Sequence, residues 1–161
     1  MGVHWTDFGT ATPVPRKRPA TAAGRSTPSR LEDLLPYPLR VVMWGVETKS
    51  EQNQRGHWAV KARRVAAQRQ QTAAWLAGYR IHLLLVGLEV RDQGGRLRVT
   101  LTRIGRRKFD SDGAVASLKA VRDEVARLLG VDDGNDRIDW RYEQELGSPS
   151  NPGVVVEIEA A

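Results

Sequence analysis

Acidic residues gather at two places in the C-terminal half of the chain. Asp110 and Asp112 form an Asp-x-Asp pair, and Asp132 and Asp133 form a second, adjacent pair. Carboxylate oxygens suit Mg²⁺ or Mn²⁺, which proteins hold with one or two carboxylates, waters and substrate phosphates. Two-metal phosphodiester cleavage needs carboxylates that converge from separate chain segments. The two pairs are therefore the candidate metal ligands, with Asp110 and Asp112 as candidate catalytic residues.

Lys119 is the candidate catalytic lysine between the two pairs. At 100° per residue, Asp112, Lys119 and Asp123 fall on one face of a helix, opposite an apolar stripe. A lysine at this place would stabilise charge on a phosphate or help to activate water, and Asp123, four residues further on, would hold the lysine. The alternative is a solvated helix face with an ordinary Lys–Asp pair.

A third set of residues is basic and is expected to contact phosphates. The net charge is +4 over residues 1–30, +8 over 31–110 and −6 over 111–161. A basic bulk with an acidic C-terminal third suits a polyanion whose phosphates meet a carboxylate site, although a compositional preference for Arg over Lys gives the same balance. The candidate DNA-binding residues are Arg55, Arg63, Arg64, Arg69, Arg106, Arg107 and Lys108.

The order of the expected strands and helices, which must position these residues, predicts an α+β fold that consists of a mixed sheet with two main helices. The first helix has no Pro or Gly and is basic and amphipathic. The second follows Asp112 and ends at Gly130, and Gly94 and Gly95 indicate a hairpin turn between two strands. The expected order is β-α-β-β-α-β-β, over residues 39–44, 57–77, 80–90, 96–104, 113–129, 138–143 and 154–158.

Composition limits the classes of protein to which the chain can belong. The chain has 161 residues and no cysteine, which excludes disulfide scaffolds, thiolate metal sites and cysteine nucleophiles. Six of the eight prolines lie in residues 1–38, so we expect a disordered basic tail over residues 1–30 and one domain over residues 31–161. The apolar run at residues 83–88 is too short for a membrane span, and no secretion signal is apparent. The expectation is a cytoplasmic protein with no membrane partner.

At these residues the chain resembles a known family. The segment 110–112, Lys119, Asp123 and the segment 129–133 are similar to the core of the RusA-like Holliday junction resolvases, which are phage- and prophage-associated endonucleases. Residues 50–58 and the basic helix after them resemble the N-terminal half of that family, so the likeness spans about residues 39–159. The resemblance implies a small homodimer that uses Mg²⁺ to nick branched DNA, such as four-way junctions, in recombination and repair.

The resemblance also implies roles for single residues. Asp110, Asp112 and one or both of Asp132 and Asp133 would hold the metal, and Lys119 would be the catalytic lysine.

Two departures from the family pattern bear on activity. Gly113 stands where the family has Asn, and the family lysine position is Ala116 here, three residues before Lys119. Loss of the Asn amide leaves a catalytically degenerate, non-enzymatic DNA-binding protein of the same fold as the alternative function.

A further condition concerns geometry. The two acidic pairs flank a helix of roughly 25 Å. They share a metal ion only if the chain turns back after Gly130 or if two subunits meet.

Overall fold

The computed structural model describes residues 38–49 and 58–161. The predicted tail over residues 1–30 and the candidate residue Arg55 lie outside the described residues. The elements in chain order are β1 (Leu39–Trp44), α1 (Trp58–Leu76), the 3₁₀ turn η2 (Ala77–Tyr79), α2 (Arg80–Asp92), β2 (Leu97–Gly105), α3 (Ser111–Leu129), β3 (Ile138–Leu146) and β4 (Gly153–Ala160).

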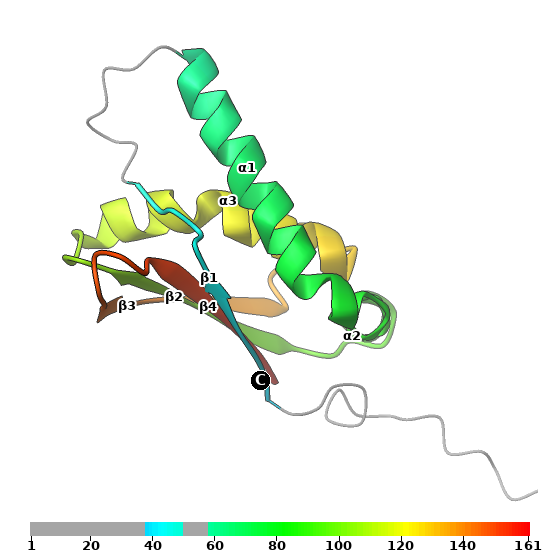
Figure 1. Ribbon diagram of the computed structural model, residues 1–161. Coiled ribbons are helices and arrows are strands. Elements are labelled where there is room, and N and C mark those ends of the chain that lie inside the picture. Colours follow the sequence, from blue (N-terminus) through cyan, green and yellow to red (C-terminus); the bar gives the residue numbers. More distant parts are fainter. Residues whose placement is uncertain (1–37, 50–57) are drawn as a thin grey trace, which may run out of the picture.

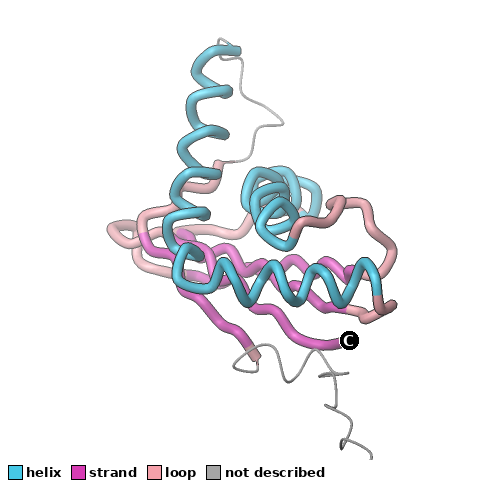
Figure 2. Tube along the Cα trace, turned by 90° about the vertical axis from the view of Figure 1, so that its right-hand side faces the viewer, coloured by secondary structure: helices cyan, strands magenta, loops and turns pink. Residues whose placement is uncertain are grey.

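Four strands form one mixed sheet in the order β1-β4-β2-β3. β4 is antiparallel to both β1 and β2, whereas β3 runs parallel to β2 and is reached through α3. The helices lie on one face of the sheet (Figures 1 and 2), and the hydrophobic core fills the space between them. The predicted α+β class with a mixed sheet is confirmed.

One predicted strand is wrong, because residues 80–90 are helical in α2. The buried residues of α2 are Leu83, Val86, Gly87 and Val90. This i, i+3, i+4, i+7 spacing follows the helical period rather than the alternation of a strand. The run is also rich in leucine, which favours helices. The apolar composition of the segment concealed this period.

The predicted hairpin at Gly94 and Gly95 is therefore also wrong. Gln93 caps α2, Gly94 adopts a positive φ of 81°, and the Gly95 amide donates to the Glu89 carbonyl at 3.2 Å. These features terminate a helix. The element order is thus β-α-α-β-α-β-β, with one more helix and one fewer strand than expected.

Glycine at position 87 allows α2 to approach α3 closely. A Cβ atom at this position would lie 1.6 Å from the Leu129 carbonyl oxygen. Any larger residue would force the two helices apart. This contact fixes the C-terminal end of α3, and hence the chain that leads to Asp132, against α2.

The predicted helix over residues 113–129 is confirmed, but it starts earlier. α3 begins at Ser111, and its N-cap is Asp110 rather than Asp112. The Asp110 Oδ1 atom accepts a hydrogen bond from the Gly113 amide at 3.0 Å, which satisfies one of the unpaired donors at the helix start. Gly130 ends the helix with a positive φ of 69°, as expected.

The first predicted helix is confirmed as α1, and its buried residues lie in its C-terminal half. Its buried residues are Gln68, Thr72 and Leu76, whereas Trp58 is 75 % exposed. In Figures 1 and 2 the N-terminal half stands away from the sheet. α1 therefore projects a basic surface into solvent.

The helical stretch Trp58–Asp92 is long and apolar enough to span a membrane, judged by length and composition alone. One such stretch is weak evidence for a span. The stretch is interrupted by η2, and both of its helices pack on α3 within the domain.

Candidate functional site

The first acidic pair lies at the N-terminal end of α3. Asp110 and Asp112 are both exposed. Asp110 uses one oxygen to cap the helix, and the Ser111 hydroxyl lies 3.5 Å from Asp112 Oδ1. The helix N-terminus carries partial positive charge, which stabilises carboxylates at this place. The two side chains give a pair of oxygen ligands open to solvent.

The second acidic pair follows the C-terminal end of α3, and its two carboxylates differ. Asp133 Oδ2 lies 3.4 Å from Arg122 Nε, and its backbone carbonyl accepts from Arg122 and from Trp140. Asp132 Oδ1 accepts from the Gly134 amide at 2.8 Å, and within the described chain it makes no ion pair. A cation would have to compete with Arg122 at Asp133, so Asp132 is the more available ligand of the two.

A single chain keeps the two acidic pairs apart. α3 has 19 residues, which at ~1.5 Å per residue is about 28 Å. The chain after Gly130 leads into β3, whose first residue pairs with Leu97 at the start of β2, and Asp110 follows the other end of β2. The chain after Gly130 therefore does not bring the second acidic pair back to the first. Of the two conditions for a shared metal site, only the meeting of two subunits is left. Within residues 38–49 and 58–161, no three His, Asp or Glu side chains come together.

Lys119 lies on the same face of α3 as Asp112. Its charged neighbours are one carboxylate, Asp123, and one cation, Arg69. The Lys119 Nζ atom is 3.2 Å from Asp123 Oδ1, so the expected ion pair is present, and the lysine side chain is 69 % exposed, as the alternative of a solvated helix face also predicts. The other Asp123 oxygen is 2.6 Å from Arg69 on α1. Asp123 thus fixes one cation from each of two helices next to each other.

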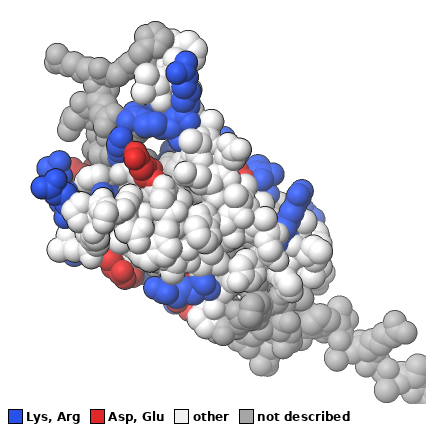
Figure 3. Space-filling model, in the orientation of Figure 1, with Lys and Arg blue, Asp and Glu red and all other residues white. Residues whose placement is uncertain are grey.

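The predicted phosphate-binding residues fall in two groups among the described residues. Arg63, Arg64 and Arg69 lie on α1, with Arg64 half-buried, and the segment 106–108 is an exposed loop between β2 and α3. Figure 3 shows Lys and Arg side chains over α1 and at the left-hand end of the molecule, where this loop lies. The predicted phosphate-binding loop 106–108 therefore lies beside the Asp110 end of α3, while Arg122 and Arg127 lie toward its other end.

Arg103 is a buried residue that the sequence analysis missed. It is 6 % exposed, and its Nε atom donates to Thr48 Oγ1 at 2.8 Å. Its Nη1 atom donates to the Arg107 carbonyl at 2.7 Å, and its guanidinium stacks on Phe109 at 3.8 Å. Burial lowers the pKa of Arg103, yet an arginine keeps its charge at neutral pH. Arg103 therefore anchors the loop that carries the basic side chains to the start of α3.

Gln144 on β3 holds the same loop from the next strand. Its Oε1 atom accepts from the Phe109 amide at 2.8 Å, and its Nε2 atom donates to the Phe109 carbonyl at 3.0 Å. Gln144 is the cross-strand partner of Arg103. The two side chains together fix the residue immediately before Asp110, so they position the first acidic pair.

Replacing Gln144 by alanine should destabilise the domain by about 1–3 kcal/mol, because both backbone groups of a half-buried residue lose their partner. Urea unfolding measures the free energy, and amide hydrogen exchange at Phe109 measures the local opening. Glu143→Ala is the matched control, because Glu143 is exposed on the same strand. Equal free energies of unfolding for the two variants would contradict this role of Gln144.

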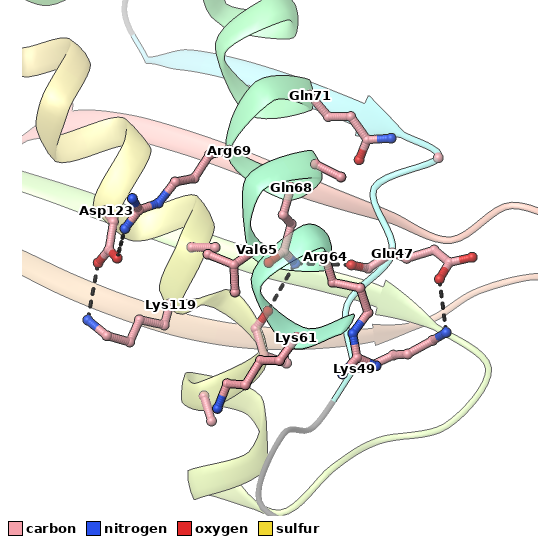
Figure 4. Close-up of a pocket in the computed structure, with 15 residues that line it drawn as sticks. Glu47, Lys49, Lys61, Arg64, Val65, Gln68, Arg69, Gln71, Lys119 and Asp123 are labelled. Carbon is pink, nitrogen blue, oxygen red and sulfur yellow. Dashed lines mark hydrogen bonds and ion pairs between the residues drawn. The ribbon is translucent and has the colours of Figure 1, made fainter. Parts of the chain in front are cut away.

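A cavity of about 570 Å³ lies between α1, α3 and the chain after β1. Figure 4 shows its cationic side chains and the pairing of Asp123 with Lys119 and Arg69. Gln68 joins its three walls, because its Nε2 atom donates to the carbonyls of Glu47 at 3.0 Å and Ser117 at 3.1 Å. Of the predicted site residues, Lys119, Arg64 and Arg69 line this cavity.

Comparisons with protein-family models and with curated proteins found no match for this chain.

Proposed function

We propose that the protein is a Mg²⁺-dependent endonuclease that nicks branched DNA such as four-way junctions. The observation that carries the proposal is the Asp110–Asp112 pair at the N-terminus of α3, with Lys119 on the same helix face and a basic surface beside it. Oxygen ligands, a lysine and phosphate-binding cations are the groups that phosphodiester hydrolysis uses.

The available ligands fit Mg²⁺ in chemistry. Asp110 and Asp112 would hold the ion together with substrate phosphate, since Mg²⁺ is usually bound by one or two carboxylates and phosphates. A bound Mg²⁺ supplies polarisation of the phosphate and lowers the pKa of a coordinated water. Lys119 would stabilise charge on the phosphate while Asp123 holds its ammonium group in place.

The working unit is a homodimer in this proposal. Asp132 and Asp133 reach the ion held by Asp110 and Asp112 only if they come from a second copy, because α3 separates the pairs within one chain. Two copies related by a two-fold axis would form two such sites. Two sites suit a junction, which presents two equivalent strands.

An exposed apolar stripe on α2 supports association of two copies. Ile81, Leu84, Leu85 and Leu88 are each more than 40 % exposed and follow a helical spacing. Leu84 lies beside Gly130, so the stripe adjoins the end of α3 from which Asp132 and Asp133 follow. Burial of this stripe against a second copy would remove apolar surface from water.

A synthetic four-way junction tests the proposal directly. We expect paired nicks at symmetry-related positions with Mg²⁺, none with EDTA, and none on a linear duplex of the same sequence. Binding of the junction without nicks at any Mg²⁺ or Mn²⁺ concentration would instead support the catalytically degenerate DNA-binding protein, which Gly113 favours. A protein that binds neither substrate contradicts both functions.

Gly113→Asn should raise the nicking rate at limiting Mg²⁺ by about 10–100-fold, because it restores an amide that can support a ligand or a coordinated water. The effect should be small at saturating Mg²⁺. Gly113 lies in the first turn of α3 and its φ is not positive, so its backbone accepts asparagine; because Gly113 is buried, the melting temperature of the variant tests whether the side chain fits.

The measurement for this variant is the nicking rate as a function of Mg²⁺ concentration, with melting temperature as the control for folding. An unchanged Mg²⁺ dependence in a stably folded variant would mean that the site does not use this position.

A cytoplasmic location, where phage and cellular DNA are processed, belongs to the same proposal.

A further inference from the structure

The cavity between α1 and α3 has an excess of positive charge. Five cationic and two acidic side chains line it, and they come from α1, α3 and the chain after β1. The cations are Lys49, Lys61, Arg64, Arg69 and Lys119, and the carboxylates are Glu47 and Asp123. A concave site with this balance attracts a ligand that carries phosphate.

The two carboxylates of the cavity pair with three of its five cations, so an excess of positive charge remains. Glu47 pairs with Lys49 at 3.1 Å, and Asp123, whose side chain is 19 % exposed, pairs with Arg69 and Lys119. Asp123 thereby restrains two long, flexible side chains, whereas the Glu47–Lys49 pair is solvent-exposed and contributes little. A phosphate then meets cations whose conformational freedom is already reduced, which lowers the entropy cost of binding.

The walls of the cavity are fixed before any ligand arrives. Gln68 is buried and links the carbonyls of Glu47 and Ser117, and the Thr72 hydroxyl donates to the Gln68 carbonyl at 2.8 Å. Small side chains, Val65, Ala116 and Ala120 among them, form an apolar wall between the charged groups. The volume of about 570 Å³ is within the usual range for a site that encloses a small molecule.

The position of the cavity relates it to Asp112. Ala116, Lys119 and Asp123 line the cavity, and on α3 they continue the face that begins with Asp112. Asp112 lies about 6 Å along the helix axis from Ala116. A strand that occupies the cavity therefore continues toward the acidic pair.

We infer that this cavity binds an unpaired nucleotide of a DNA strand, with its phosphate on the cationic rim and its base against the apolar wall. A duplex does not enter a cavity of this size, whereas a nucleotide from an opened branch point does. The inference rests on the proposed function for the identity of the nucleic acid. It adds to that function a site that selects unpaired over paired DNA.

Binding of a short single strand in EDTA tests the site without nicking. The probe is a fluorescein-labelled four-nucleotide thymidine strand, followed by fluorescence anisotropy. We expect Lys61→Gln to weaken binding about tenfold, the size of one charged hydrogen bond. Arg80→Gln removes the same charge from an exposed position outside the cavity and should change binding less than twofold.

A steric pair of variants tests the same site without a change of charge. Ala67 lines the cavity and Ala66 does not, although both are exposed alanines on α1. Ala67→Tyr should weaken binding of the strand about tenfold by filling the space, and Ala66→Tyr should not. Melting temperatures confirm that all four variants fold.

The competitors identify the ligand. An unlabelled four-nucleotide strand should displace the probe at lower concentration than thymidine monophosphate or a blunt duplex does. Equal competition by the mononucleotide would overturn the inference in favour of a free nucleotide, and equal competition by the duplex would overturn the preference for unpaired DNA. Equal affinities within both variant pairs would show that the strand binds elsewhere.

These outcomes are separate from those of the proposed function. A wild-type protein that binds the strand in the cavity but never nicks a junction would refute the nuclease and leave the cavity site. A protein that nicks junctions but shows no difference within the variant pairs would refute the cavity site and leave the nuclease.

Discussion

Asp112→Asn should reduce Mg²⁺-dependent nicking by about a thousandfold or more, because loss of a ligand charge removes several kcal/mol of stabilisation at the phosphate. Junction binding should stay the same or become tighter, since one carboxylate that repels phosphate is gone. The fold should not change, because Asp112 is exposed and the helix cap is Asp110.

The measurements for Asp112→Asn are nicking rate, junction affinity and melting temperature. Asp136→Asn is the matched control, because Asp136 is an exposed aspartate in the turn before β3 and has no part in the proposed site. A nicking rate for Asp112→Asn equal to that of the control would remove Asp112 from the site. Equal losses in both variants would indicate a general effect of charge.

Two inactive variants should restore activity when they share a dimer. Asp112→Asn damages the N-terminal end of α3, and the double change of Asp132 and Asp133 to Asn damages the other end. If each site takes one end from each copy, a mixed dimer carries both defects in one site and leaves the second site intact. The purified mixed dimer should therefore have half of the wild-type number of intact sites, a large rise from the near-zero rate of either variant alone.

The mixed dimer is obtained by co-expression with two affinity tags and purification over both. It should nick one strand of a junction and not make the symmetric pair of nicks, which a denaturing gel resolves. Asp112→Asn mixed with Asp110→Asn is the control, because both changes lie at the same end of α3 and neither site stays intact. No recovery in the first mixture would contradict a site built from two copies.

The helix that carries the candidate site was predictable from its sequence. The stripe of Leu118, Val121 and Val125 follows the helical period, and Gly130 supplies the left-handed cap that L side chains disfavour. The helix over residues 80–92 was not predictable in this way, since several apolar residues in a row fit a buried strand as well as a buried helix. The helical spacing of Leu83, Val86 and Val90 becomes evident only in their burial within the fold, where Gly87 lets α2 approach α3 at Leu129.

The alternation of the strands indicates in part where the positioning residues Arg103 and Gln144 lie. Leu97, Val99 and Leu101 alternate toward the core, and the next residue in this series is Arg103. The same alternation along β3, every second residue from Ile138, reaches Gln144. A charged or amide side chain on the buried face of a strand end needs a polar partner, but only the structure shows that the partner is the loop before Asp110.

The length of α3 acquires a geometric meaning in the proposed dimer. Each site combines the start of one copy of α3 with the end of the other, so the two sites lie about one helix length apart, roughly 28 Å for 19 residues. α3 then acts as a molecular ruler for the spacing of the two nicks. One added helical turn would lengthen it by about 5.4 Å and rotate its end by only a few tens of degrees, which shifts the span between the scissile phosphates while each site keeps its ligands.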